Sequence, residues 1–182
     1  MKAKIQHEIQ EYCSLLKLNA ICEHFEEAIK SATDYEGFLH QLLRMEVDAE
    51  EERAKERKIK AAKFPYRKYI EDLELDLLPE AMRKRLPELC SLDFIRESKN
   101  IIMTGNPGTG KTHTAIGLGI KACEQGYRVL YTTIPYLVTE LKESNSQQKL
   151  RSYQKRFEKY DLIIADELGY ISFDREAADL LF

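Results

Sequence analysis

Gly105-Asn-Pro-Gly-Thr-Gly-Lys-Thr112 is the stretch of sequence that decides the fold. The apolar run Asn100-Ile-Ile-Met-Thr104 precedes it and predicts a buried strand, and residues 112–125 follow it with the pattern of a helix that ends before Gly126. The glycines permit a backbone path on which successive N–H groups turn toward one anion, and the helix N-terminus adds a positive dipole end. The spacing G-x-x-x-x-G-K-[ST] in this context therefore predicts a phosphate-binding loop that takes a nucleoside triphosphate.

The polar side chains of this loop have expected roles. Lys111 reaches the β- and γ-phosphates, and the hydroxyl of Thr112 binds Mg²⁺. A glycine-rich turn that binds nothing is the alternative, but strand, loop and helix occur together here and favour the phosphate loop. The expected ATP-binding residues are Gly105, Asn106, Pro107, Gly108, Thr109, Gly110, Lys111 and Thr112.

A second motif predicts hydrolysis. Tyr160-Asp-Leu-Ile-Ile-Ala-Asp-Glu167 is an apolar strand that ends in two carboxylates, and residues 128–132 supply one strand between it and the loop. We expect Asp166 to hold Mg²⁺ opposite Thr112, and Glu167 to polarise the attacking water. The catalytic candidates are therefore Glu167 and Lys111. Adjacent Asp and Glu also favour ATP-hydrolysing families over Ras-like GTPases, which position water with a Gln.

Composition indicates the number of domains and argues against a membrane span, a signal peptide and a cysteine metal site. The chain has 182 residues, 32% charged and 43% hydrophobic, which predicts one domain with an extension or two small domains. No stretch has the length of a membrane span, and the N-terminus lacks the apolar core of a signal peptide. The four cysteines lie without metal-like spacing and predict core residues in a reducing cytoplasm.

The first third of the chain has helical periodicity and no nucleotide chemistry. Three helices are expected, the last of which begins at the capping box Thr33-Asp-Tyr-Glu36 and runs to about Ala62. The predicted organisation is a helical region over 1–63, a linker with short helical pieces over 64–88, and an ATP-binding domain over 89–182.

A basic stretch over residues 53–68 has two interpretations. It forms a solvated helix face whose charges pair along the helix, or it contacts DNA phosphates. A second basic cluster before the Asp-Glu strand supports the DNA contact, and the absence of a base-reading motif predicts contacts mostly to the backbone. The DNA-binding candidates are Arg53, Lys55, Arg57, Lys58, Lys60, Lys63, Lys149, Arg151, Lys155 and Arg156.

These features together resemble the IstB family of AAA+ ATPases, which help insertion-sequence transposases and are related to the helicase loader DnaC. The resemblance rests on Leu92-Asp-Phe-Ile95, on the loop through His113, and on residues 160–170, and the run Asp174-Arg-Glu-Ala-Ala-Asp-Leu-Leu-Phe182 continues it. It implies an α/β fold of the P-loop AAA+ type with a parallel sheet, preceded by an all-α region. It also implies ATP and Mg²⁺ as ligands, a cytoplasmic protein, and self-association into an ATP-dependent oligomer on double-stranded DNA that presents target DNA to a transposase.

Two other functions stay open beside that one. A helicase loader like DnaC has the same nucleotide chemistry with a replicative helicase as its partner. A truncated DNA-binding remnant that does not hydrolyse ATP belongs to a different class, and its DNA binding should not depend on Lys111 or Glu167.

The sequence departs from the resembled family after Glu167. A sheet of that family has the strand order 5-1-4-3-2, and the fourth and fifth strands and the lid lie beyond this chain. They would take roughly 60 residues at about 30 per strand–helix unit. The sensor residue and the arginine finger are expected in that part, and Arg175 is not assigned as the finger. We expect a fragment or a truncated product that binds ATP poorly and scarcely hydrolyses it.

Overall fold

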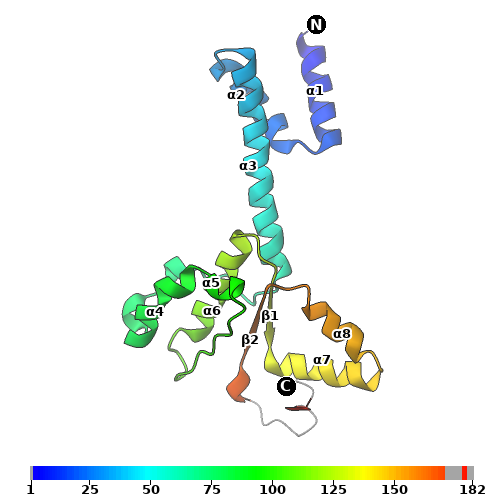
Figure 1. Cartoon of the computed structure of the whole chain (residues 1–182). Coiled ribbons are helices and arrows are strands. Elements are labelled where there is room, and N and C mark those ends of the chain that lie inside the picture. Colours follow the sequence, from blue (N-terminus) through cyan, green and yellow to red (C-terminus); the bar gives the residue numbers. More distant parts are fainter. Residues whose placement is uncertain (1, 171–177, 180–182) are drawn as a thin grey trace. The chain divides into compact units, whose positions relative to one another are not determined.

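The computed structural model describes residues 2–170 and 178–179 of the chain (Figure 1). Arg175 and most of the run from Asp174 to Phe182 lie outside the described residues. The chain divides into two compact units, residues 1–54 and 55–182, while the boundaries predicted after residues 63 and 88 stay predictions. Within the described ranges, no helix combines the length and the apolar character needed to cross a membrane.

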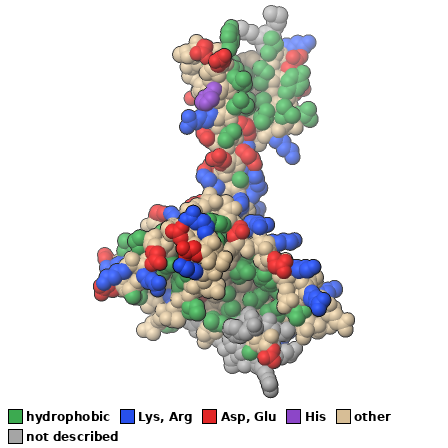
Figure 2. Space-filling view, in the orientation of Figure 1, with side chains coloured by type: hydrophobic (Ala, Val, Ile, Leu, Met, Phe, Trp, Pro, Cys, Tyr) green, Lys and Arg blue, Asp and Glu red, His purple; other side chains and the backbone are tan. Residues whose placement is uncertain are grey.

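The first unit consists of helices, as predicted. It contains α1 (Lys2–Leu16), α2 (Asn19–Ser31) and the first part of α3 (Tyr35–Ala61). Phe25, Ala28 and Leu42 form its buried core, since residues spaced three or four apart share one helix face. Leu15 and Tyr35 are 80% and 95% exposed, and Figure 2 shows hydrophobic side chains on the outer surface of the N-terminal helices.

Two carboxylates in this unit accept hydrogen bonds from backbone N–H groups in the first turns of α3 and α2. The cap of α3 is Asp34, whose Oδ1 accepts a hydrogen bond from Gly37 N at 2.6 Å, so the cap lies one residue after the predicted Thr33. The buried Glu46 accepts from Ile21 N at 3.1 Å and from Arg53 Nη2 at 2.6 Å. Burial acts to raise the pKa of Glu46, but the hydrogen bonds from Arg53 and the α2 backbone outweigh it and lower that pKa.

The second unit holds a parallel pair of strands, as the sequence predicts. β1 (Val129–Thr133) pairs with β2 (Leu162–Asp166) in the register that sets Thr133 beside Asp166. The helices α7 (Ile134–Ser146) and α8 (Leu150–Phe157) connect the strands and lie on one side of them in Figure 1. On the other side lie α4 (Glu80–Cys90), α5 (Asp93–Arg96) and α6 (Lys111–Glu124). This crossover puts the carboxyl ends of both strands at the same edge.

Helix α6 (Lys111–Glu124) is the centre of this unit. Its side chains Ile116, Ile120 and Cys123 are buried among the residues that pack on the strands. A Cβ atom at Gly119 would lie 2.7 Å from Ile164 and 2.8 Å from the Phe64 ring, so glycine allows the helix its close approach to β2. The helix predicted behind the loop and the two strands predicted after that helix are present, and the α/β class with N-terminal helices is confirmed.

The segment predicted as a linker contains the short turns η1 (Ile70–Asp72) and η2 (Leu75–Leu77), followed by the helix α4 (Glu80–Cys90). Leu73, Leu78 and Leu86 form a small buried cluster there. Helix α5 (Asp93–Arg96) follows directly after Leu92, which is left-handed at φ 60° and 1% exposed.

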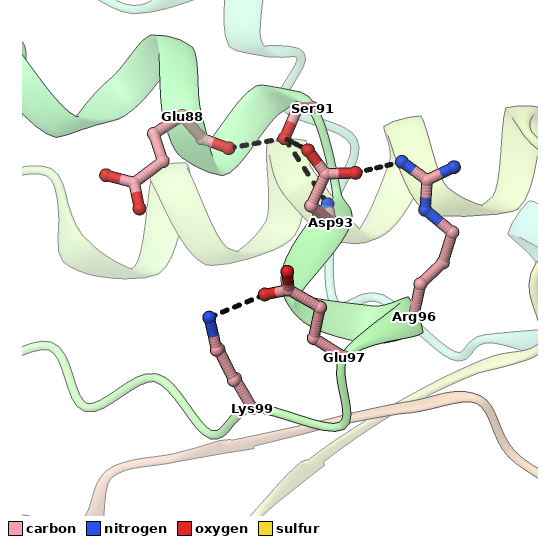
Figure 3. Close-up of polar contacts among 6 residues, drawn as sticks. All are labelled: Glu88, Ser91, Asp93, Arg96, Glu97 and Lys99. Atoms are coloured by element: carbon pink, nitrogen blue, oxygen red, sulfur yellow. Dashed lines mark hydrogen bonds and ion pairs between the residues drawn. The ribbon is translucent and has the colours of Figure 1, made fainter.

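Polar contacts hold the corner between α4 and α5 (Figure 3). Ser91 Oγ lies 2.8 Å from Glu88 O and 2.7 Å from Asp93 Oδ2. Arg96 pairs with the other oxygen of Asp93, and Lys99 pairs with Glu97 at 2.6 Å. These contacts join the end of α4 to α5 and to Lys99, which follows α5.

One expectation of the sequence analysis is wrong in this structure. Residues 100–104 form no strand, and Ile102 is 82% exposed instead of buried. In the described part of the chain β1 and β2 pair only with each other, so the backbone of residues 100–104 has no neighbouring strand with which to form a ladder. An apolar run becomes a strand only where such a partner satisfies its N–H and C=O groups.

Candidate nucleotide-binding site

The phosphate loop over residues 105–110 bends through three glycines with positive φ. Gly105, Gly108 and Gly110 have φ of 148°, 79° and 77°, values that residues other than glycine seldom adopt. Lys111 Nζ donates to the carbonyl oxygens of Gly105 and Asn106, both at 2.8 Å. The ammonium group therefore lies over the loop, where an incoming phosphate would meet it.

The helix behind the loop begins at Lys111 with Gly110 as its N-cap. Thr114 Oγ1 donates to Gly110 O at 2.9 Å, and a Cβ atom at Gly110 would lie only 2.8 Å from Leu78 Cδ2. Leu78 thus packs against the last turn of the loop. The free N–H groups of this helix start and its dipole make the position favourable for an anion.

The two sequence motifs meet at one hydrogen bond. Thr112 Oγ1, in the first turn of α6, donates to Asp166 Oδ2, at the end of β2, over 2.9 Å. These residues are 54 positions apart in the sequence. Threonine hydroxyl and carboxylate oxygens are the hard ligands that Mg²⁺ prefers beside water and substrate phosphates. The residues at this position therefore fit a nucleotide-bound Mg²⁺.

Glu167 follows directly in an unusual backbone conformation. Its φ is 65°, in the left-handed region, and its N–H donates to Asp166 Oδ1 at 2.8 Å. The side chain is exposed. A non-glycine residue in this region costs about 1 to 2 kcal/mol, and such strain is common at functional positions.

A third residue, which the sequence analysis did not select, belongs to this group. Tyr131 on β1 donates from its hydroxyl to Asp166 Oδ2 at 2.9 Å. Burial and the hydrogen bond to Asp166 raise the pKa of Tyr131. A tyrosine inside a strand is ordinary, so the sequence carries no signal that separates this one from the others.

Two hollows adjoin Lys111. One of about 400 Å³ is lined by the α4 side chains Met82 and Arg85, by Met103 and by Thr109. The other, of about 230 Å³, is lined by Thr112, Asp166 and apolar residues of β2. His113, beside the loop, has its Nε2 2.9 Å from Tyr69 O, so its ring is held by the backbone before η1.

The DNA-binding candidates have different surroundings. Arg53, in the first unit, pairs with Glu46 and Glu50. Lys58 donates to Gly126 O just after α6, where it stabilises the helix end. Arg156 lies 5.8 Å from the Tyr153 ring centre and 3.9 Å from Glu140. The exposed side chains are Arg57, Lys60, Lys63, Lys149, Arg151 and Lys155, and Lys55 is half-buried.

The chain is similar to proteins of insertion sequences. The family described as IstB-like ATP binding protein matches residues 13–182. A protein of Pseudomonas aeruginosa named as an ATP-binding protein of insertion sequence IS21 is 34% identical over 180 residues, 97% of this chain and 68% of that protein. One of Geobacillus stearothermophilus, named for insertion sequence IS5376, is 34% identical over 182 residues, 98% of this chain and 72% of that protein. Both similarities extend over the helical region as well as the loop.

Proposed function

The chain belongs to the IstB-like ATP-binding protein family, and from this we propose that it is an ATP-dependent helper of insertion-sequence transposition that binds ATP with Mg²⁺ at residues 105–112. The observation that supports the proposal best is the Thr112–Asp166 hydrogen bond of 2.9 Å. It joins the phosphate loop to the carboxylate pair at one edge of a parallel sheet, where nucleotides bind in folds of this class.

Each residue of the site has its own role in phosphoryl transfer. The loop N–H groups and Lys111 hold the phosphates, and Thr112 and Asp166 hold the metal. Bound Mg²⁺ would neutralise charge on the β- and γ-phosphates. Glu167 orients a water whose oxygen bonds to the γ-phosphorus, while the bond from that phosphorus to the β–γ bridging oxygen breaks. ADP and phosphate are the products, and the proton that the water loses passes to solvent.

The working unit that we propose is an oligomer on double-stranded DNA that presents target DNA to the transposase. The printed names of the similar proteins, which assign them to insertion sequences, support the transposition role. The exposed Lys60, Lys63, Lys149, Arg151 and Lys155 support the DNA contact, because exposed cationic side chains can neutralise phosphates.

The test compares two site variants with a matched lysine control. Lys111→Ala should abolish ATP binding and ATP-stimulated assembly on DNA, whereas Glu167→Gln should bind ATP and keep the assembly from dissociating. Lys121→Ala removes a lysine from the same helix about 15 Å further along and should behave as wild type. ATP binding by Lys111→Ala at the wild-type affinity would contradict the proposed site, and dissociation of the Glu167→Gln assembly at the wild-type rate would contradict the role of Glu167.

A further inference from the structure

We propose that Tyr131 is a positioning residue that holds the carboxylate of Asp166 in the orientation needed by the nucleotide-bound metal. The inference rests on the proposed function and deepens it. Tyr131 lies on β1, a strand that carries no part of the phosphate loop or of the carboxylate pair. Its hydroxyl is nevertheless as close to Asp166 Oδ2 as the hydroxyl of Thr112, at 2.9 Å in both cases.

The strand register explains why Tyr131 reaches this position. Thr133 stands beside Asp166 and Tyr131 beside Ile164 in the parallel pair. Side chains two residues apart on a strand point to the same face, so Tyr131 and Asp166 share a face. The long phenol then spans the diagonal toward the carboxyl end of β2, a distance that a shorter polar side chain at this position could not cover.

The carboxylate is held at three points. Oδ2 accepts hydrogen bonds from Thr112 and Tyr131, and Oδ1 accepts one from Glu167 N at 2.8 Å. A carboxylate has about four acceptor positions, so two donors occupy those of Oδ2 and one position on Oδ1 stays open. Without the tyrosine hydroxyl, Oδ2 would be free to turn away from Thr112 or to take a water in its place.

The phenol itself is held in place from two directions. Its ring contacts Phe64, with centroids 6.2 Å apart and planes tilted by 58°. The backbone N–H of Tyr131 donates to Ala62 O at 2.8 Å, just beyond the end of α3. The hydroxyl is therefore offered to Asp166 by a side chain that has little freedom to move, which is how an outer partner orients a metal ligand.

The experiment measures metal dependence instead of turnover. Tyr131→Phe removes the hydroxyl and keeps the ring on Phe64. The affinity of the 182-residue chain for a fluorescent ATP analogue is measured in EDTA and across a Mg²⁺ series. Tyr131→Phe should bind the analogue as wild type does in EDTA, and its Mg²⁺ midpoint should rise about 10-fold, as loss of an outer partner commonly does.

Tyr153→Phe is the matched control. Its hydroxyl also donates to a carboxylate, Glu140 Oε2 at 2.6 Å, and the side chain is half-buried like that of Tyr131. It does not bond to Asp166, so its Mg²⁺ midpoint should equal that of wild type. In an Asp166→Asn background Tyr131→Phe should add nothing, because the two residues act through one interaction.

The outcomes separate this inference from the function on which it rests. A Mg²⁺ midpoint of Tyr131→Phe equal to that of Tyr153→Phe overturns the positioning role, as does an equal shift in the Asp166→Asn background. Wild type that binds no analogue, or binds it without any effect of Mg²⁺, overturns the proposed function and the inference with it. Should Tyr131→Phe unfold, Phe64→Leu takes its place. This variant keeps the hydroxyl and removes the ring support, and an unchanged midpoint there refutes the inference.

Discussion

The substitution Gly110→Ala tests how tightly the phosphate loop is packed. Gly110 has φ of 77°, and a Cβ atom there would lie 2.8 Å from Leu78 Cδ2. Gly108 is the matched control, since its φ of 79° is nearly the same but a Cβ atom there would meet nothing within 4 Å. The two variants therefore share the backbone strain and differ in one steric contact.

The magnitudes follow from these two contributions. Alanine in the left-handed region costs about 1 to 2 kcal/mol, and both variants carry this loss. Carbon atoms in contact prefer roughly 3.5 to 4.0 Å, so Leu78 must move by about an ångström away from the new methyl group inside its buried cluster. Overpacking of this kind costs about 1 to 3 kcal/mol. We expect Gly110→Ala to lower the free energy of unfolding by about 2 to 5 kcal/mol, against about 1 to 2 for Gly108→Ala.

The assay is urea and thermal unfolding followed by circular dichroism, because the chain has no tryptophan to report by fluorescence. The excess loss in Gly110→Ala corresponds to roughly 3 to 5 °C of melting temperature per kcal/mol for a unit of this size. Leu78→Val in the Gly110→Ala background should restore part of the difference, because valine removes the atom that the new methyl group meets. Equal destabilisation by Gly108→Ala and Gly110→Ala would refute the packing of Leu78 on the loop.

Two further predictions concern charged groups outside the loop. Glu46→Gln should lower the free energy of unfolding by about 1.5 to 3 kcal/mol at neutral pH. The pKa of Glu46 is lowered in the folded state. Its contribution to the free energy of unfolding is therefore complete above the unfolded pKa of about 4.3 and is lost as the pH falls through the folded pKa. The difference in stability between Glu46→Gln and wild type should shrink in acid, and a difference that does not change with pH would contradict this prediction. The double variant Lys60→Glu, Lys63→Glu should weaken DNA binding and reduce the slope of log affinity against log salt by about 2. The affinity is measured by fluorescence anisotropy of labelled DNA across a salt series. An unchanged slope would mean that both lysines belong to a solvated helix face.

The local sequence was enough to predict the elements that depend on short-range order. Helical periodicity predicted three N-terminal helices, and α3 ends at Ala61, one residue from the predicted end. Glycine spacing predicted the loop and the helix behind it. The meeting of Thr112 and Asp166 also followed from sequence, because parallel strands bring their carboxyl ends to one edge.

Features of the structure that depend on residues distant in the sequence were not predictable. Residues 100–104 have the composition of a strand, but a strand needs a neighbour to satisfy its backbone, and in the part of the chain that the structure describes no strand pairs with them. Lys58 and Arg53 look like other basic side chains of their stretch, yet Lys58 closes the end of α6 and Arg53 pairs with a buried carboxylate.

The sequence by itself determined that this chain has a phosphate loop, a carboxylate pair and a helical region before them, because spacing and periodicity are local properties. Only the tertiary structure decided which groups surround that pair. Tyr131 precedes Asp166 by 35 positions and reaches it through strand register and the length of one side chain. Leu78, which follows η2, lies beside Gly110 at the start of α6 although 32 positions separate the two residues in the sequence. Such contacts come from the packing of whole elements against each other, which a pattern along the chain does not encode.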